Sequence, residues 1–165
     1  VLADSKAKII KELNNTQSFK FDFNQNIKGV LEKGECIIVF PKKLKCEYKN
    51  QKKIILKENT LAIVQERYGK VQYYPVSKSP FTKILDKVEL IKLIKLGNIT
   101  ELENQFQLTN SLQINNVIIL FDKFDYSLRG WKIRDQLNNN VEFLIKIKSK
   151  NFNIKKNEFE IPSFN

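Results

Sequence analysis

The strongest constraint on the fold is a short run in which phenylalanine alternates with polar residues, Phe19-Lys20-Phe21-Asp22-Phe23. Successive side chains of a β-strand point to opposite faces, so the three rings share one face and the polar side chains share the other. Three large rings on one face must be kept from water, either by the rest of the protein or by a ligand. The run therefore predicts a strand whose aromatic face lies against a core or a bound molecule.

Other parts of the chain also predict short strands joined by turns. Residues 34–40 and 44–48 flank a Pro41-Lys42-Lys43 turn, which is the pattern of a β-hairpin. Further strands are predicted at residues 53–56, 60–64, 71–74, 103–109, 116–122, 128–135 and 141–147. Regular short strands at this spacing are typical of a meander that forms a barrel or a sandwich sheet.

Two parts of the chain predict helices instead. Residues 4–16 begin with a capping residue, Asp4 or Ser5, and continue with an apolar stripe. In residues 81–96 the apolar side chains recur at intervals of three and four, at Phe81, Ile84, Leu85, Val88, Ile91 and Ile94. This second segment is apolar on more than one side, so it either lies deep against the sheet or forms a lid over something apolar.

These elements make up a single domain, residues 1–165, that is mainly β with some helix. The pattern predicts one antiparallel sheet of about ten strands, preceded by a helix and interrupted by one or two more. An aromatic sheet face and an apolar helix can together enclose a cavity that suits an acyl chain. Burying such a chain is favourable by about 0.8 kcal/mol per CH₂ group.

The charge balance permits anionic partners without selecting one. Net charge is +11, and the basic residues are almost all lysines scattered through every predicted element. Nucleic acid and anionic membrane surfaces both fit this balance. Arginine, whose forked side chain dominates base and phosphate recognition, occurs only at Arg67, Arg129 and Arg134, which weakens the nucleic-acid hypothesis. A lysine-rich proteome with A/T-biased codons also accounts for the charge.

No arrangement of residues predicts catalysis. The chain has no histidine, so the commonest general base and metal ligand is missing. The sequence contains no nucleophile elbow, phosphate-binding loop or dinucleotide fingerprint, and its two cysteines lack metal-type spacing. We therefore expect a binding protein rather than an enzyme, with no metal and no cofactor.

Two features bear on the cellular compartment. Val1 and Ala3 fit the small residues that a signal peptidase prefers, so the chain is expected to follow a removed secretory signal, although an arbitrary start fits equally well. Cys36 and Cys46 lie symmetrically about Pro41, so a hairpin would bring them face to face. They are either a disulfide or two reduced, small apolar residues, and the sequence leaves both readings open.

Three motifs in order along the chain carry a family resemblance. Phe19 or Phe21, with Phe23 and Gln25, matches a phenylalanine-x-x-x-phenylalanine-x-glutamine strand. A proline hairpin and a Gly-Trp-x-x-x-Asp strand are matched by Pro41, Lys45, Glu47 and Tyr48, and by Gly130, Trp131 and Asp135. With this order and spacing, the chain resembles the periplasmic outer-membrane lipoprotein carrier family (LolA-like) from end to end.

The resemblance implies an incomplete antiparallel β-barrel of about ten to eleven strands, closed by an N-terminal helix and a mid-chain helix pair acting as a lid. It implies a monomeric periplasmic carrier that takes acylated lipoproteins from an inner-membrane ABC-type releasing complex to an outer-membrane receptor, with no cofactor and no nucleic acid. The residues expected to line the acyl cavity are Phe19, Phe21, Phe23, Ile38, Phe40, Leu44, Tyr48, Phe81, Ile84, Leu85, Val88 and Ile91.

The chain departs from the family pattern at two positions. The family's arginine before the hairpin proline, which ties the sheet to the lid by hydrogen bonds, is Phe40 here, so lid gating is expected to differ. A usual aromatic residue is replaced by Cys46. Two alternatives stay open: a lipoprotein-binding sensor or receptor of the same fold, and a basic nucleic-acid-binding β-domain, which would need exposed aromatic rings for stacking.

Overall fold

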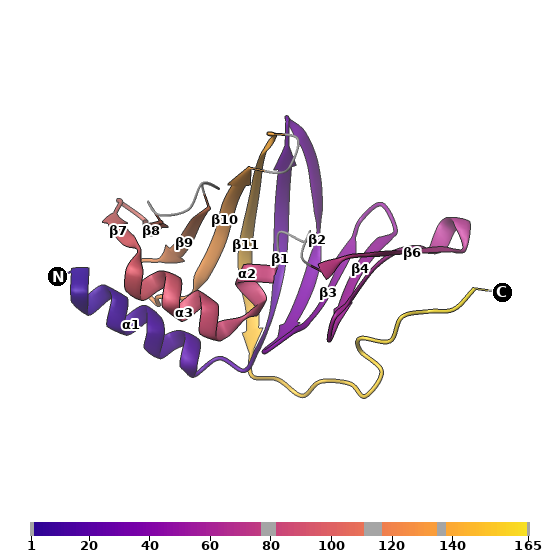
Figure 1. Cartoon of the computed structure of the whole chain (residues 1–165), viewed down its shortest axis with the longest axis horizontal. Coiled ribbons are helices and arrows are strands. Elements are labelled where there is room, and N and C mark those ends of the chain that lie inside the picture. Colours follow the sequence, from indigo (N-terminus) through magenta and orange to yellow (C-terminus); the bar gives the residue numbers. More distant parts are fainter. Residues whose placement is uncertain (1, 77–81, 111–116, 135–137, 165) are drawn as a thin grey trace.

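The computed structural model describes residues 2–76, 82–110, 117–134 and 138–164, and it contains one antiparallel sheet of 11 strands with helices on one face (Figure 1). The helices are α1 (Leu2–Asn14), α2 (Thr82–Leu85) and α3 (Lys87–Leu96), and a short 3₁₀ turn, η1 (Glu66–Tyr68), lies between two strands. The strands are β1 (Ser18–Ile27), β2 (Val30–Val39), β3 (Lys43–Tyr48), β4 (Lys52–Lys57), β5 (Thr60–Gln65), β6 (Lys70–Tyr74), β7 (Asn98–Glu101), β8 (Gln105–Thr109), β9 (Ile118–Asp122), β10 (Leu128–Arg134) and β11 (Asn140–Lys150).

The order of the strands joins two meanders at the middle of the sheet. The order is β6-β5-β4-β3-β2-β1-β11-β10-β9-β8-β7, so the first strand of the chain pairs with the last. Within the described residues the sheet is not closed into a barrel, because β6 and β7 form two separate edges. This confirms the predicted mainly β fold with an incomplete barrel of ten to eleven strands.

The face of the sheet that the helices cover, called here the inner face, carries the main core. Phe19, Phe21 and Phe23 on β1 are 2%, 0% and 2% exposed, as their alternation with polar residues predicts. Ile9 and Leu13 of α1 and Leu90 and Ile94 of α3 belong to the same cluster of buried side chains as these rings. The two-residue period of β1 therefore fixes which face receives the helices.

The mid-chain helices differ from the prediction mainly in which residues face the sheet. The segment expected as one or two helices within residues 81–96 is broken at Asp86, whose backbone is extended and whose side chain accepts a hydrogen bond from the Glu89 backbone at 3.2 Å. Asp86 is thus the N-cap of α3, and α2 is a separate single turn. No described helix is long and apolar enough to cross a membrane.

One strand was missed, and one segment covers the opposite, outer face. Residues 98–101 lie between the predicted helical segment 81–96 and the predicted strand 103–109, and they form β7, in which Ile99 is the one buried residue. The C-terminal residues 151–164 run past the ends of the strands without forming one themselves (Figure 1). Phe159 packs there with Ile37, Ile55 and Val64 on the outer face of the sheet.

Candidate functional site

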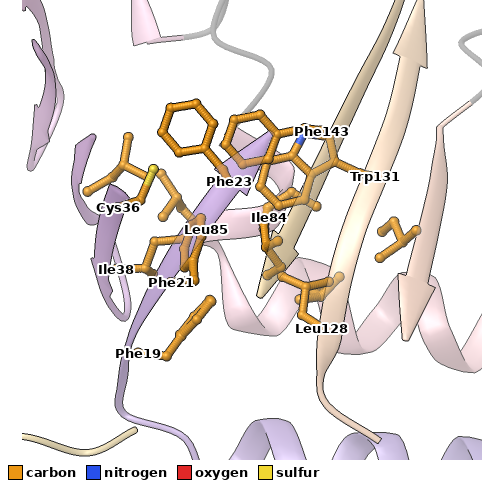
Figure 2. Close-up of a cluster of buried hydrophobic side chains, with 14 of the residues drawn as sticks. Phe19, Phe21, Phe23, Cys36, Ile38, Ile84, Leu85, Leu128, Trp131 and Phe143 are labelled. Atoms are coloured by element: carbon orange, nitrogen blue, oxygen red, sulfur yellow. The ribbon is translucent and has the colours of Figure 1, made fainter. Parts of the chain in front are cut away.

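The inner face is built around stacked aromatic rings contributed by strands from both meanders. Phe143 of β11 stacks on Phe23 at 4.8 Å and on Trp131 at 4.6 Å between ring centroids. Tyr48 meets the other side of Phe23 edge-on at 4.8 Å. Figure 2 shows Phe23, Phe143 and Trp131 close together, with Ile84 and Leu85 of α2 beside them. The aromatic cluster therefore joins the central strands to the short helix that lies over them.

Most of the residues predicted to line an acyl cavity lie together in this core. Phe19, Phe21, Phe23, Ile38, Leu44, Tyr48, Ile84 and Leu85 belong to one buried cluster, and Phe40 and Ile91 pack against it half-buried. Phe81 lies outside the described residues. Among the described residues the side chains of this cluster are almost inaccessible to solvent, so an acyl chain that contacts Phe21 or Ile38 would have to separate α2 from the sheet. Their role in acyl binding stays a prediction.

The prediction was wrong for Val88. Its side chain is 74% exposed, so it does not face the phenylalanine strand. The prediction placed Val88 from one unbroken apolar periodicity through residues 81–96, but the extended Asp86 resets the helical phase. In α3 the buried positions are Leu90 and Ile94, four residues apart, and Val88 turns to the solvent.

The two cysteines are bonded to each other on the inner face. Cys36 of β2 and Cys46 of β3 are directly opposite in the register, form a disulfide, and are both 0% exposed. This decides the question that the sequence left open. The bond lies beside Phe21, which pairs with Cys36 across β1 and β2.

A polar group borders the aromatic cluster where β1, β2, β3 and β4 meet. The Tyr48 hydroxyl donates to Gln25 Oε1 at 3.2 Å, and Lys52 Nζ lies 3.0 Å from Glu32 Oε2 and 4.1 Å from the centre of the Tyr48 ring. Burial, together with the nearby charge of Glu32, raises the pKa of Tyr48, so the phenol remains a donor. Gln25 and Tyr48 were predicted from motifs, whereas Glu32 and Lys52 carry no signal in the sequence.

Phe40 takes part in a different contact between the sheet and the helices. Lys87, the first residue of α3, places Nζ 4.7 Å from the centre of the Phe40 ring and donates to the Thr16 carbonyl oxygen at 2.7 Å. Burial lowers the pKa of Lys87. The cation of this contact is thus supplied by helix α3, and the aromatic ring by the residue that follows β2.

Replacing Lys87 with methionine is expected to loosen α3 by about 1–2 kcal/mol, since it removes a charged hydrogen bond and a cation–π contact while keeping the apolar stem. Hydrogen exchange should show faster exchange of the α3 amides, with exchange in β1 little changed. Lys92→Met is the matched control, because Lys92 is exposed on the same helix. Equal α3 exchange in the two variants would contradict the role given to Lys87.

The aromatic face of β1 is apolar and almost closed to solvent. The rings of Phe19, Phe21 and Phe23 are at most 2% exposed, so they cannot stack on nucleic-acid bases in this structure. No group of three or more potential metal ligands occurs among the described residues. What the inner face offers is a large apolar surface under a short, separately capped helix.

Known proteins support this description at the level of fold and family. Residues 14–162 match the family described as "Outer membrane lipoprotein carrier protein LolA". No curated protein matches the sequence significantly.

Solved structures are similar to this chain at very low sequence identity, and two of the three described here have a TM-score above 0.5. An uncharacterised conserved protein from Thermus thermophilus is 6% identical, with a TM-score of 0.55 over 97% of this chain and 93% of that one. MucB is 5% identical, with a TM-score of 0.52 over 98% of this chain and 63% of that one. A LolA superfamily protein from Nitrosomonas europaea is 5% identical, with a TM-score of 0.46 over 94% and 97% of the two chains.

The fold agrees with the two structures that have the higher TM-scores, and the family match extends from the end of α1 to the C-terminal segment. Because that match covers residues 14–162 of the 165, the chain belongs to the outer membrane lipoprotein carrier protein LolA family.

Proposed function

We propose that this protein binds the acyl chains of lipoproteins between α2 and the inner face of the sheet, and carries them through the periplasm from the inner to the outer membrane. The observation that carries the proposal is the buried aromatic face of β1 beneath a single-turn helix, in a chain of this family. Its partners would be acylated lipoproteins, an inner-membrane ABC-type releasing complex and an outer-membrane receptor.

The chemistry of the inner face suits this ligand. The side chains of Phe21, Ile38, Ile84 and Leu85 are all at most 1% exposed and offer only carbon surface. An acyl chain is recognised by area rather than by hydrogen bonds, so such a surface binds it without selecting a sequence of the attached protein.

The way the cover is built supports a protein that opens. Helix α2 has only four residues and is separated from α3 by the extended Asp86, so it can move without unwinding a long helix. Lys87 holds the start of α3 against Phe40 and Thr16 through contacts that are strong but few. Movement of α2 away from β1 would expose Phe21 and Ile38 to an incoming chain.

Purified protein is expected to bind a fluorescent fatty acid saturably, and a photoactivatable fatty acid should label peptides from β1, β2 and α2. Ile38→Ala should weaken fatty-acid binding about fivefold, because it removes apolar contact area from the inner face. Fluorescence titration gives the affinity, and mass spectrometry of the labelled peptides gives the position.

The matched control is Ile55→Ala. Ile38 and Ile55 are 0% and 1% exposed on opposite faces of the same sheet, so the two changes should cost similar stability. Only Ile38→Ala should change fatty-acid affinity. An equal effect of both variants, or labelling confined to residues 151–164, would place the ligand elsewhere and refute the proposal.

The carrier role needs a separate measurement, since binding alone also fits a sensor. A triacylated lipoprotein bound to this protein should pass to acceptor vesicles that carry an outer-membrane receptor. The protein should also take up a triacylated lipoprotein from membranes that contain an ABC-type releasing complex. Binding of lipoprotein without transfer in either direction would favour the sensor alternative.

A further inference from the structure

The turn between β1 and β2 exposes two adjacent apolar side chains. Val30 and Leu31 are 63% and 68% exposed, and in Figure 1 this turn lies at the top of the view. Lys28 and Gly29 have positive φ angles of 52° and 81°, and Asn26 Oδ1 accepts a hydrogen bond from the Gly29 backbone at 2.8 Å. The tip is therefore a tight two-residue turn that holds both side chains in place.

The two side chains point to opposite faces of the hairpin. Val30 shares the inner face with Gly34 and Cys36, and Leu31 lies on the outer face, because neighbours along a strand alternate. A flat protein surface can cover only one of these faces at a time. An apolar medium that surrounds the tip covers both.

Unpaired lysines surround the tip. Three exposed lysines lie here: Lys28 and Lys33 on the hairpin, and Lys49 beside it. The Lys49 backbone donates a hydrogen bond to the Lys33 carbonyl oxygen. None of the three lysines has an ion-pair partner among the described residues. The nearby acids are already paired, Glu32 with Lys52 at 3.0 Å and Glu142 with Lys132 at 3.6 Å. The surface just behind the apolar tip is therefore positive.

An apolar row connects the tip to the rest of the inner face. In the strand register Val30 is opposite Ile27, Ile27 is opposite Val141, and Val141 is opposite Ile133. Ile133 packs against the main core. The tip is thus the outer end of a continuous apolar strip, and not an isolated pair of exposed side chains.

Because the hairpin tip is apolar on both faces and is surrounded by unpaired lysines, we infer that the β1–β2 turn inserts Val30 and Leu31 into the surface of an anionic lipid bilayer. The lysines would lie at the level of the lipid phosphates, where each contributes about 1 kcal/mol, or about fivefold in affinity. The contact is separate from acyl binding, and either can be present without the other.

Vesicle cosedimentation tests the inference with the full chain. The wild-type protein should bind phosphatidylcholine vesicles that contain phosphatidylglycerol, and bind pure phosphatidylcholine vesicles much more weakly. Val30→Ser/Leu31→Ser should weaken binding to the anionic vesicles about tenfold or more. Lys28→Gln/Lys33→Gln should reduce it by about fivefold per lysine and lower its salt dependence.

The chain offers a matched control in Val88→Ser/Leu96→Ser. Val88 and Leu96 are 74% and 66% exposed on α3, so this variant removes the same two residue types at similar exposure. Its vesicle binding should equal that of the wild type. All of these positions are exposed, so thermal unfolding of each variant should remain close to the wild-type curve.

A Leu31→Trp variant reports insertion directly, because the native Trp131 is buried at 1% exposure. Its added fluorescence should shift to the blue with anionic vesicles. The inference fails if the serine pair at the tip binds vesicles as the wild type does, if the control pair loses as much binding, or if the emission of the Leu31→Trp variant does not shift. A tip that instead docks on a protein would give the first of these results.

Discussion

Replacing Gly34 with alanine is expected to destabilise the protein by about 3 kcal/mol or more. A Cβ atom at this position would lie 2.1 Å from the Glu47 carbonyl oxygen and 2.7 Å from the Phe23 ring. The first contact is with backbone, so β2 and β3 would have to separate next to the Cys36–Cys46 bond. The absence of a side chain at Gly34 is what lets Phe23 and Tyr48 lie against the sheet.

Urea unfolding of two separate variants, Gly34→Ala and Gly29→Ala, measures their free energies of unfolding. The comparison separates the steric cost at Gly34 from the general cost of losing a glycine. Gly29 has φ +81°, and a Cβ atom added there would have no neighbouring atom within 4 Å, so its replacement should cost only about 1 kcal/mol of backbone strain. A Gly34→Ala variant no less stable than Gly29→Ala would show that the strands adjust and that the aromatic packing does not depend on Gly34.

Removing the disulfide is the second change with a large expected effect. Cys36→Ala/Cys46→Ala should lower the free energy of unfolding by about 2–4 kcal/mol, since the bond closes a loop across a sequence separation of 10. Both cysteines are 0% exposed, so a reductant should act on the wild-type protein only after it unfolds. The wild-type protein is therefore unfolded in denaturant with or without reductant and then refolded. Thermal unfolding of the two samples measures the difference in stability between the reduced and the oxidised protein.

Ile38→Val is a suitable control for the lost side-chain volume. Ile38 pairs with Leu44 in the next inward-facing row after the cysteines, and losing one methylene there should cost about 0.5–1.5 kcal/mol without removing a cross-link. The stability of Ile38→Val should not respond differently to reductant from that of the wild type. Wild-type protein that is equally stable when reduced and oxidised would contradict the expected contribution of the bond.

The sheet could be predicted from the sequence because its inner face depends on a simple alternation. Phe19, Phe21 and Phe23 are buried as the two-residue period requires, and Cys36 lies opposite Cys46 as the proline turn requires. These features can be predicted from short segments, because the alternation of residues within a strand shows which of its faces is buried. β7 was missed because a four-residue strand with Ile99 as its single apolar residue has no periodic pattern.

The candidate site was less predictable, because it depends on how separate elements meet. Val88 was misplaced through one extended residue, Asp86, that no periodic pattern reveals. The contact of Lys87 with Phe40 joins residues far apart in the sequence, and their pairing follows only from the place of α3 on the sheet.

The filled inner face has a consequence for any chain that binds there. Ile84 and Leu85 are buried against the inner face at 0% and 1% exposure, so under the proposed function a fatty acid would enter by exchange with the protein's own side chains. The apolar area gained by the ligand is partly offset by the area that α2 gives up. The apparent affinity would then fall with the fraction of molecules in which α2 is open, and the return of α2 to the sheet would favour release. On the proposed function, α2 would compete with the cargo for the same surface, and this competition would help the protein to pass the cargo on.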